Sequence, residues 1–491
     1  MKTARRTLIL LGVMAMMCVL PAQSQHLEDQ VVNWTDFSYV NYIASSMTYV
    51  YFATTGGITR YNKVNRTWEE PLTGSPGIDS ERINRIWVDT FDEHLYVETE
   101  VGLYEYDPLF GSWFPIDELP AVRTNTRHVA LPQPMIPPPG FNYTASGNLI
   151  DPYARSWGVV DAIDDGAGTF WLGTWGYGAA TAEVGPNEIE ILPYGLLQND
   201  ITNLLFDGDI LWIAGRAAFS ARTGLSAFDL ANQSFSYIES GTRSDFPTAD
   251  VTSLEVDENA LYVGTDIGLM LYNFDLERFV DRLDRRNGLT SDEVVCLRKV
   301  GDSLFIGTAG GLTVLDFVAD SVQYVNPSEL FNQVIYDIEP FGEHVWIGAE
   351  NGAYRLSRAD GKLQKFRDPT QVLFSRVYNI ESYEQEIWFA SDLGVVRMDT
   401  ETGESRDYSL PSLRYGSRAL AVNDGVAAVA SDRGMTLIFR EEHKPVSREF
   451  SIDDGLASDR VTSLLLDGDY LWIGTDRGLT RFYWNNPRRI D

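Results

Sequence analysis

The stretch "LWIGTDRGLTRF", Leu471 to Phe482, decides the fold, because worn copies such as "LYVGTDIGLMLYN" and "LFIGTAGGLTVLD" recur along the whole chain. Aligned on the residue two positions before the small one, normally an aromatic, ten copies lie at Tyr51, Tyr96, Trp171, Trp212, Tyr262, Phe305, Trp346, Trp388, Ala428 and Trp472. The copies return every 40 to 50 residues, except that Tyr96 and Trp171 lie 75 residues apart. This period is typical of four-stranded propeller blades, and the exception indicates an insertion.

The residues of a single copy account for the strands of one blade. Side chains alternate along "LWIGT", so Trp472 and Gly474 share one face, where a bare backbone lets a neighbouring sheet approach closely. The hairpin "TDRGL" follows, and Gly478 supplies the positive φ that other residues resist. An upstream strand at Val461 and an outer strand such as "FVDRL" at Phe279 complete the four. Both faces are apolar, so no copy can bury itself alone.

The two ends of the chain complement each other. The segment "VVNWTDFS" at Val31 looks like an outer strand without its first three, and the last copy stops at "RFYWNNP", after its third strand. Pairing the two would complete one blade and remove two exposed sheet edges. We therefore expect an all-β propeller of about ten four-stranded blades in one closed ring, with two smaller propellers as the alternative.

The pattern "DGLxSxxVxSLxxDGxxLWIGTxxGLxRF", read in Asp454 to Phe482 and partly in Asn287 to Leu315, resembles the two-component regulator propeller repeat. This resemblance covers nearly the whole chain after its first residues and implies the propeller fold. The family occurs in periplasmic sensor regions of bacterial hybrid histidine kinases and in related secreted proteins. Only nine residues follow Phe482 here, so the chain looks like a free-standing secreted member, similar in arrangement to propellers that serve surface-protein secretion.

The first residues predict export. Basic residues precede an apolar run from Leu8 to Leu20, and small residues lead to a cleavage point near Ser24, so residues 1–24 read as a signal peptide. Twin-arginine export, suggested by Arg5 and Arg6, is an alternative to ordinary export. Residues 25–491 would form the propeller, and no later apolar run is long enough for a membrane span. The expected location is the periplasm, the exterior or the cell surface.

Charge and cysteine content exclude some functions. The 491 residues carry a formal net charge of −31, which disfavours nucleic acid and anionic lipid as partners. Cys296 is the only cysteine after the predicted cleavage point, so no intramolecular disulfide can form and packing must stabilise the fold.

The sequence contains no recognised pattern for catalysis or metal binding. The five histidines are scattered singly, and "DGD" at Asp207 and Asp467 reads as a turn rather than a calcium loop. The chain has no "GxSxG" and no Walker loop. We expect no cofactor, no metal and no catalytic residues. A glycan- or peptide-processing enzyme, such as a lyase or hydrolase assembled from distant loops, is the alternative.

The pattern fails between the second and fourth copies, and such failures often mark function. Residues 118–157 form an inserted loop rich in proline and aromatic residues, and the next two hairpins, "TWGYGA" and "GRAAFSARTGL", are abnormal. All three should emerge on one face of the propeller. The predicted aromatic and cationic ligand site, suited to a sugar, a peptide strand or a carboxylate, consists of Trp157, Trp175, Tyr177, Arg216, Phe219 and Arg222. The alternative is a loop that merely plugs the channel.

A second hypothesis concerns the mouth of the channel. The residue before the first strand of each copy should stand on the same face as the inserted loop. In ring order this gives an acidic arc of Asp200, Asp250 and Glu293, and a basic arc of Arg376, Arg418, Arg460 and Arg82. The basic arc would bind anionic groups such as carboxylates, and chance placement of solvated turn residues is the alternative.

These observations favour an exported, non-catalytic binding or scaffold propeller over an enzyme. Its partner would be an unknown envelope protein, a peptide or a glycan.

Overall fold

The structure is a computed structural model that describes residues 31–73, 77–78, 80–108, 110–217, 220–241, 245–319, 321–325, 329–408, 419–431, 433–440 and 447–485. The predicted signal peptide, residues 1–24, lies outside this description. Within the described ranges the chain forms ten antiparallel sheets, nine of four strands and one enlarged by the insertion. The prediction of about ten mostly four-stranded blades is therefore confirmed.

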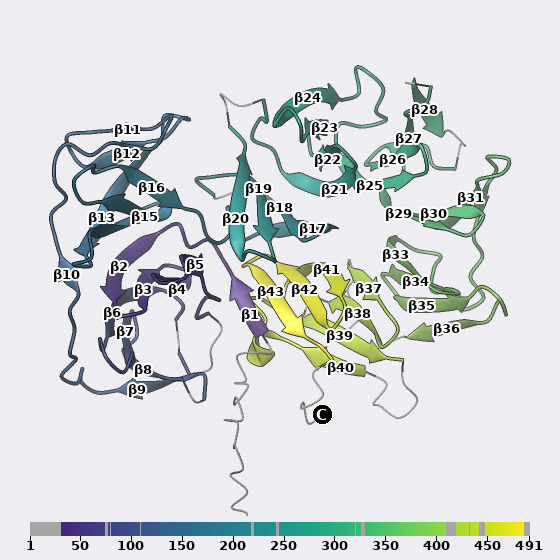
Figure 1. The fold of residues 1–491 in the computed structure, drawn as a ribbon. Helices are drawn as coiled ribbons and strands as arrows, with labels where there is room; N and C mark the ends of the chain where they lie inside the picture. Colours follow the sequence, from purple (N-terminus) through teal and green to yellow (C-terminus); the bar gives the residue numbers. More distant parts are fainter. Residues whose placement is uncertain are drawn as a thin grey trace, which may run out of the picture.

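Seven of the sheets form a closed ring, which we call the ring (Figure 1). Its first three blades are β17 (Ile201–Asp207), β18 (Ile210–Gly215), β19 (Gly224–Asp229) and β20 (Ser234–Glu239); β21 (Val251–Asp257), β22 (Ala260–Thr265), β23 (Gly268–Asn273) and β24 (Arg278–Leu283); and β25 (Val294–Val300), β26 (Ser303–Thr308), β27 (Gly311–Asp316) and β28 (Ser321–Val325).

The next three blades of the ring are β29 (Ile335–Phe341), β30 (His344–Ala349), β31 (Gly352–Ser357) and β32 (Leu363–Lys365); β33 (Val377–Tyr383), β34 (Glu386–Ser391), β35 (Gly394–Asp399) and β36 (Ser405–Tyr408); and β37 (Leu420–Val422), β38 (Val426–Ser431), β39 (Gly434–Phe439) and β40 (Ser447–Phe450). The 3-10 helix η3 (Ile452–Asp454) precedes the last blade, which contains β41 (Val461–Asp467), β42 (Tyr470–Thr475), β43 (Leu479–Tyr483) and β1 (Val31–Trp34).

The other three sheets form what we call the three-bladed unit, residues 40–192. Its blades are β2 (Val40–Ser45), β3 (Tyr49–Thr54), β4 (Gly57–Asn62) and β5 (Thr67–Trp68); β6 (Ile83–Val88), β7 (Leu95–Thr99), β8 (Leu103–Asp107) and β9 (Ser112–Ile116); and β13 (Ser156–Asp164), β14 (Thr169–Thr174), β15 (Gly178–Glu183) and β16 (Ile189–Leu192). The insertion adds β10 (Arg127–His128), β11 (Asn142–Tyr143) and β12 (Asn148–Ile150) to the third of these.

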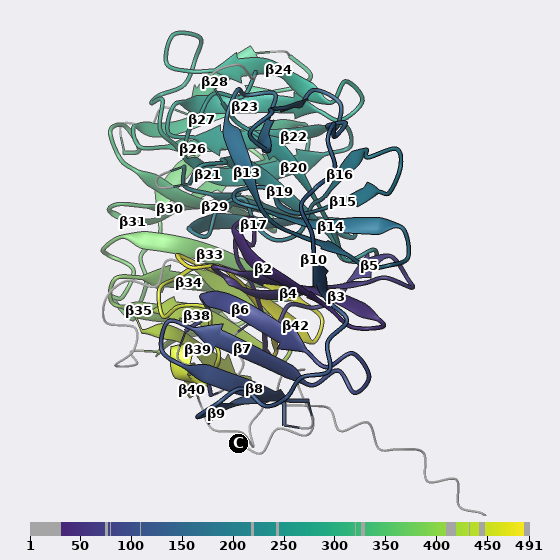
Figure 2. The ribbon, with the colours of Figure 1, turned by 90° about the vertical axis from the view of Figure 1, so that its left-hand side faces the viewer.

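The expectation of one ten-bladed ring is wrong, because the tenth copy packs against the fourth rather than the first. In the ring, β41 lies beside both β37 and β17, while in the three-bladed unit β2 lies between β13 and β6. Figure 2 shows the three-bladed unit in front of the ring. The arrangement is closer to the alternative of two smaller assemblies, of which the ring is closed.

The small residue of each copy explains the close packing of blades. A Cβ placed on Gly264 would lie 2.7 Å from Val294 Cγ1 of the next blade, so only a bare backbone lets the two sheets approach this closely. Gly173 meets Val40 in the same way, at 2.6 Å, which places the third copy against the first. The same contact therefore builds both assemblies.

Strand β1 closes the ring, as the ends of the sequence predict. It pairs antiparallel with β43, with Val31 opposite Phe482 and Trp34 opposite Leu479. The Trp34 side chain is fully buried and packs against Phe228 and Trp472, with ring centroids 5.3 and 5.7 Å apart. The first described strand thus completes the last blade.

The insertion covers one end of the three-bladed unit. Met135 and Leu149 of the insertion are buried in one cluster with Ala162, Leu172 and Ala180 of the third blade, on the face opposite the one that meets β2. Apolar surface that a further blade would have buried is thus removed from water. Capping this face, rather than plugging a channel, is the structural role of this part of the insertion.

The other end of the three-bladed unit has a polar face. Glu98 stands where nine of the ten copies carry glycine or alanine. Its side chain is 43% exposed and faces Arg85 across the sheet, with a nitrogen-to-oxygen distance of 3.9 Å. Among the described residues no further sheet packs on this face, and a terminal blade needs a polar face of this kind.

Two short segments connect the three-bladed unit to the ring, and they run side by side. Residues 35–39 lead out of the ring after β1, and residues 193–200 lead back into β17. The amide of Leu196 donates to the carbonyl of Thr35 at 2.9 Å, and the rings of Phe37 and Tyr194 stack with centroids 5.9 Å apart. We call these the crossing segments.

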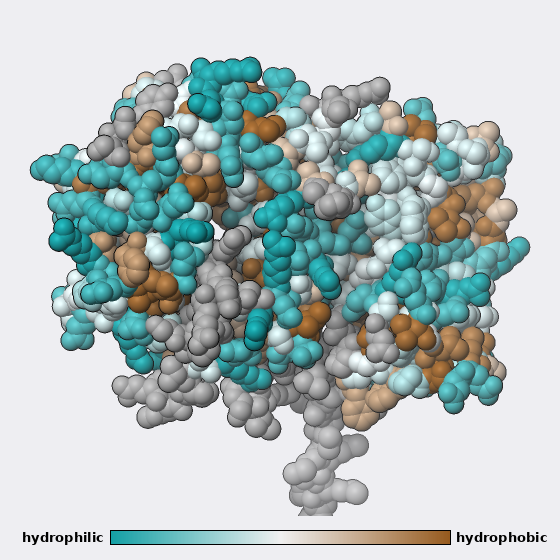
Figure 3. All heavy atoms as spheres, turned by 180° about the vertical axis from the view of Figure 1, so that it is seen from behind, coloured by the Kyte–Doolittle hydropathy of each residue, from teal (hydrophilic) through white to brown (hydrophobic). Residues whose placement is uncertain are grey.

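The back of the molecule is mostly hydrophilic, with hydrophobic residues in small separate patches (Figure 3). Within the described ranges, no helix has the length and apolar character that a membrane crossing requires.

Candidate functional site

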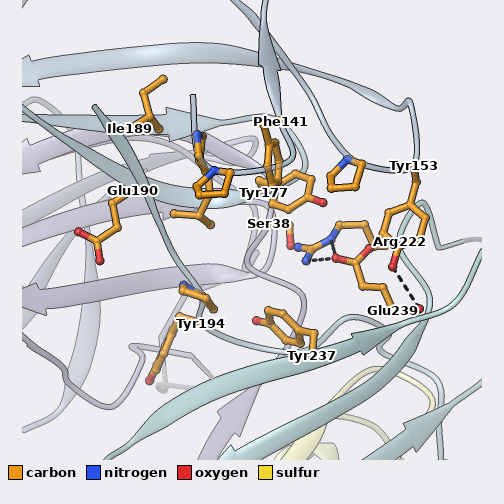
Figure 4. Close-up of a pocket in the computed structure, with 15 residues that line it drawn as sticks. Ser38, Phe141, Tyr153, Tyr177, Ile189, Glu190, Tyr194, Arg222, Tyr237 and Glu239 are labelled. Carbon is orange, nitrogen blue, oxygen red and sulfur yellow. Dashed lines mark hydrogen bonds and ion pairs between the residues drawn. The ribbon is translucent and has the colours of Figure 1, made fainter. Parts of the chain in front are cut away.

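A cavity of about 420 Å³ lies at the junction of the three-bladed unit and the ring (Figure 4). We call it the junction cavity. Strand β16 and the insertion border it from the three-bladed unit, and β20 and the hairpin after β18 border it from the ring. The aromatic residues of its wall are Phe141, Tyr153, Tyr177, Tyr194 and Tyr237.

The abnormal hairpin "TWGYGA" places Tyr177 in this wall. Gly176 has a φ of 123°, and a Cβ there would lie 1.9 Å from the Trp157 ring, so only glycine fits. Trp157 therefore packs directly against the hairpin backbone, and its ring meets the Tyr177 ring edge-on at 5.5 Å. The departure from "TDxGL" thus serves the packing of an aromatic residue from the insertion.

Arg222, in the stretched hairpin of the ring, reaches between two tyrosines. Its guanidinium carbon lies 4.0 Å from the ring centroid of Tyr177 and 5.1 Å from that of Tyr237. Its Nη2 also forms an ion pair of 2.7 Å with Glu239, and the arginine side chain is only 8% exposed. Burial of Tyr177 raises the pKa of its hydroxyl, which stays protonated at neutral pH.

A second buried ion pair lies on the insertion. Asp151 accepts hydrogen bonds from Trp157 Nε1 at 2.9 Å and from Arg155 Nε at 2.6 Å. Burial favours the neutral acid, but these hydrogen bonds outweigh it and hold the pKa of Asp151 below its ordinary value. Arg155 also bonds Glu239 of the ring at 2.5 Å, so the network crosses between the two assemblies.

The charges of this network compensate one another. Arg155 and Arg222 both contact Glu239, and Arg155 also contacts Asp151, so two cations face two carboxylates. Desolvated charges are stable only when paired in this way, and removing one partner would strand another. The junction cavity therefore presents aromatic surface and a paired network rather than an uncompensated cation, which suits an uncharged ligand better than an anion.

The structure brings three of the six predicted ligand-site residues together: Trp157, Tyr177 and Arg222. Trp175 is 40% exposed and lies beside Tyr39, at 5.2 Å between ring centroids, outside the wall of the cavity. Arg216 forms an ion pair with Asp200 at 3.2 Å, away from the cavity wall. Phe219 lies outside the described residues. Whether this site binds a ligand stays a prediction.

The residues of the predicted channel mouth are divided between the ring and the three-bladed unit. Arg82 belongs to the three-bladed unit and pairs with Glu100 at 3.1 Å. In the ring, Arg376 and Arg460 lie near the hairpin aspartates of their own blades, at 3.6 and 4.0 Å. On the acidic side, the Asp250 carboxylate accepts the Ala217 amide at 2.8 Å, and Glu293 precedes β25. Arg418 lies outside the described residues, and anion binding by this arc stays a prediction.

Sequence reasoning missed Asp151, Arg155 and Glu239. The first two lie within residues 118–157, the segment identified as abnormal, but nothing in their spacing indicates that they are buried or paired. Glu239 ends β20 at a position where an outer strand is ordinarily solvated. Their role depends on how the ring and the three-bladed unit meet, which no local pattern records.

In the described part of the chain, no group of three or more histidine, cysteine, aspartate or glutamate side chains is placed to hold a metal ion. Cys296 is buried, and burial raises the pKa of its thiol.

No family model and no curated protein matches this chain. Among solved structures, it is similar to PorZ, a bacterial surface component of the type-IX secretion system of Porphyromonas gingivalis, with a TM-score of 0.51 and 14% identity over 91% of this chain and 74% of that chain. It is also similar to the extracellular domain of BT4673 from B. thetaiotaomicron, assigned to a hybrid two component system, with a TM-score of 0.48 and 16% identity over 91% and 70% of the two chains.

A third likeness is to the extracellular domain of BT3049 from B. thetaiotaomicron, also assigned to a hybrid two component system. It has a TM-score of 0.34 and 15% identity over 92% of this chain and 82% of that chain. At these identities the likenesses show the fold alone. The propeller fold expected from the repeat is confirmed by the ten sheets of the described residues and agrees with the similarity to PorZ.

Proposed function

We propose that this protein is an exported, non-catalytic binding propeller whose ligand occupies the junction cavity. The observation that carries the proposal is the cavity itself. Tyrosines from both the three-bladed unit and the ring line it, and a network of paired charges lies beside them. Ligand sites are commonly found at such junctions between assemblies, with apolar walls and a few fixed polar groups.

The sequence and the fold support export. Residues 1–24 have the pattern of a signal peptide, and proteins of similar fold include a bacterial surface component and extracellular sensor domains. In the periplasm or at the cell surface, the protein would meet peptides, glycans and other envelope proteins. The net charge of −31 disfavours nucleic acid as the ligand.

The network makes an uncharged ligand more suitable than a carboxylate or phosphate. Both arginines near the cavity already contact Glu239, so an incoming anion would have to displace a buried carboxylate. The tyrosine rings offer flat apolar surface with hydroxyls at their edges, which suits both a sugar face and a peptide backbone.

The test is a binding screen of the full exported chain by thermal shift and calorimetry. The probes are uncharged capped peptides, neutral linear oligosaccharides and acidic peptides. We expect uncharged probes to bind, and Tyr153→Ala, which alters the cavity wall, to abolish the binding. Trp175→Ala is the matched control, because it removes an exposed aromatic outside the cavity and should bind like the parent.

Two results would contradict the proposal. Binding that survives Tyr153→Ala and is lost in Trp175→Ala would move the site to the outer hairpin. Conversion of a bound oligosaccharide or peptide into products, followed by mass spectrometry, would show an enzyme instead.

A further inference from the structure

Strand β16 forms one wall of the junction cavity and is the last strand of its sheet. It pairs with β15 through the register Thr181 opposite Glu190 and Ala179 opposite Leu192. Its other edge carries backbone groups that point away from β15. An unpaired strand edge is a template for another extended chain.

The chain itself shows that this edge accepts a strand. Ile136 of the insertion forms a parallel bridge there: its amide donates to the Asn187 carbonyl at 2.9 Å, and its carbonyl accepts the Ile189 amide at 2.8 Å. The pairing ends after this residue because the next three, 137–139, are prolines without an amide hydrogen. Residue 138 could not donate the bond that a parallel ladder requires next.

The next two groups of the ladder are the carbonyl of Ile189 and the amide of Ile191. Because the Ile189 amide points away from β15, the alternation along a strand directs both groups to the same open edge. Among the described residues neither group has a hydrogen-bond partner, and both isoleucines border the cavity. The Ile136 ladder therefore stops one residue short of an open donor and acceptor pair.

The opposite wall suits the side chains of an added strand. Tyr237 of β20 faces the cavity, together with Tyr194 from the crossing segment, and both supply apolar surface. Glu190 also borders the cavity and would repel an acidic side chain, while the two arginines near the cavity are already paired with Glu239. The part of this edge that Ile136 leaves free, from the Ile189 carbonyl to Leu192, spans about 10 Å.

We propose that the junction cavity binds a short, extended, uncharged peptide segment that adds to β16 as a parallel strand, continuing the ladder begun by Ile136. The inference rests on the proposed function and names its ligand class. One peptide amide donates to the Ile189 carbonyl, and the carbonyl of the same peptide residue accepts the Ile191 amide. Alternate side chains pack against Tyr194 and Tyr237, as in other recognition by strand addition.

The probes are capped hexapeptides that alternate Val, Ile, Tyr or Phe with Ser or Thr, and neutral linear hexasaccharides as the competing class. Hydrogen exchange of the segment 186–193, followed by mass spectrometry, reports directly on strand addition. We expect a binding peptide to slow exchange in this segment. An oligosaccharide would leave the Ile191 amide unprotected.

Each of the two predicted hydrogen bonds can be removed separately, one by a substitution in the protein and the other by a change in the peptide. Ile191→Pro deletes the open amide, which an edge strand tolerates, and should weaken peptide binding about tenfold. Ile191→Thr keeps the amide and a β-branched side chain and should bind within about twofold of the parent, the spread expected when no hydrogen bond is lost. If Ile191→Pro fails to fold, N-methylation of the peptide residue that donates to Ile189 removes the partner bond with the protein intact, and should weaken binding equally.

The outcomes separate the two proposals. Peptides that bind equally to Ile191→Pro, or that leave exchange in 186–193 unchanged, overturn strand addition. Oligosaccharide binding that depends on Tyr153, with no peptide binding, overturns the peptide ligand and leaves the proposed binding function in place. If Tyr153→Ala changes the affinity of none of the probes, the ligand does not bind in the cavity, and both proposals are overturned.

Discussion

The hydroxyl of Thr462 donates a hydrogen bond of 2.6 Å to the backbone carbonyl of Ile201, 261 residues earlier in the chain. Thr202 makes the same bond to Val251, and Thr252 to Val294, each to the first residue of the next blade. The bond from Thr462 therefore identifies the fourth copy as the neighbour of the tenth. Ring closure is made by the same contact that joins consecutive blades.

This closure predicts a strong effect of Gly474→Val. A Cβ at Gly474 would lie 2.7 Å from Ile201 Cγ2, so the two blades must separate or the strand must shift. Overpacking of this kind costs about 1–3 kcal/mol. We expect a lower midpoint in thermal and urea unfolding, measured by circular dichroism.

The matched control is Glu98→Val, at the same repeat position in the blade whose face is uncovered. It removes only an exposed ion pair with Arg85 and should change stability by about 0.5 kcal/mol or less. Equal destabilisation by the two substitutions would contradict the division into ring and three-bladed unit.

Trp34→Ala tests the strand that completes the ring. The indole of Trp34 is fully buried against Phe228 and Trp472, and truncation of such a ring costs about 3–5 kcal/mol. Unfolding should begin at a clearly lower temperature, followed by tryptophan fluorescence and calorimetry. Trp175→Ala, which removes a tryptophan that is 40% exposed, should leave the transition nearly in place. A stable Trp34→Ala protein would mean that β1 is dispensable.

Leu149→Ala tests the cap on the third blade. Leu149 is fully buried between the insertion and that blade, so its truncation should cost about 2–5 kcal/mol. We expect increased binding of a hydrophobic dye and earlier aggregation on heating. Val160→Ala, on the same sheet but half exposed, provides the comparison and should behave like the parent. The same behaviour from both variants would argue against a capping role.

Asp151→Asn should lose stability in a pH-dependent way. The pKa of Asp151 is lower in the folded state than in the unfolded chain, so the folded protein binds this proton more weakly. Its contribution is therefore fully present above about pH 4, near the unfolded pKa of aspartate, and is lost as the pH falls through the folded pKa. The variant should be less stable than the parent by about 1–3 kcal/mol at pH 7.

Urea unfolding of parent and Asp151→Asn between pH 3 and pH 7 measures this difference. The gap should stay constant from pH 7 to pH 5 and narrow below pH 4. A gap of the same size at every pH would show that the charge of Asp151 contributes nothing.

The repeat period and the alternation in "LWIGT" suffice to predict the blades, the hairpins and the pairing of β1 with β43. They do not determine which blades are neighbours. Val40 and Ile201 are both β-branched residues at the same repeat position, so the glycine of any copy could pack against either of them. One local signal did exist. Glu98 replaces the small residue in the blade at the open end, where a neighbouring sheet would have been unable to approach.

The candidate site was predictable only in part. The shared face of the insertion and the two hairpins brings Trp157, Tyr177 and Arg222 together. The compensating partners Asp151 and Glu239 could not be predicted from the sequence, because the pairing of buried charges depends on how the ring and the three-bladed unit meet. Arg216 has the same residue type and hairpin as Arg222, yet it pairs with Asp200 instead.

The crossing segments place the two ends of the three-bladed unit next to each other. The chain leaves the ring after β1 at Thr35 and returns through residues 193–200. Two hydrogen bonds join the exit and the entry: the Leu196 amide donates to the Thr35 carbonyl at 2.9 Å, and the Asp36 amide donates to Asn199 Oδ1 at 2.7 Å. A segment with adjacent ends behaves as a cassette that can be exchanged or lengthened without disturbing the host. Variation in the cassette would remodel one wall of the cavity while the seven-bladed host keeps its geometry, so ligand preference can diverge between descendants that share the same scaffold.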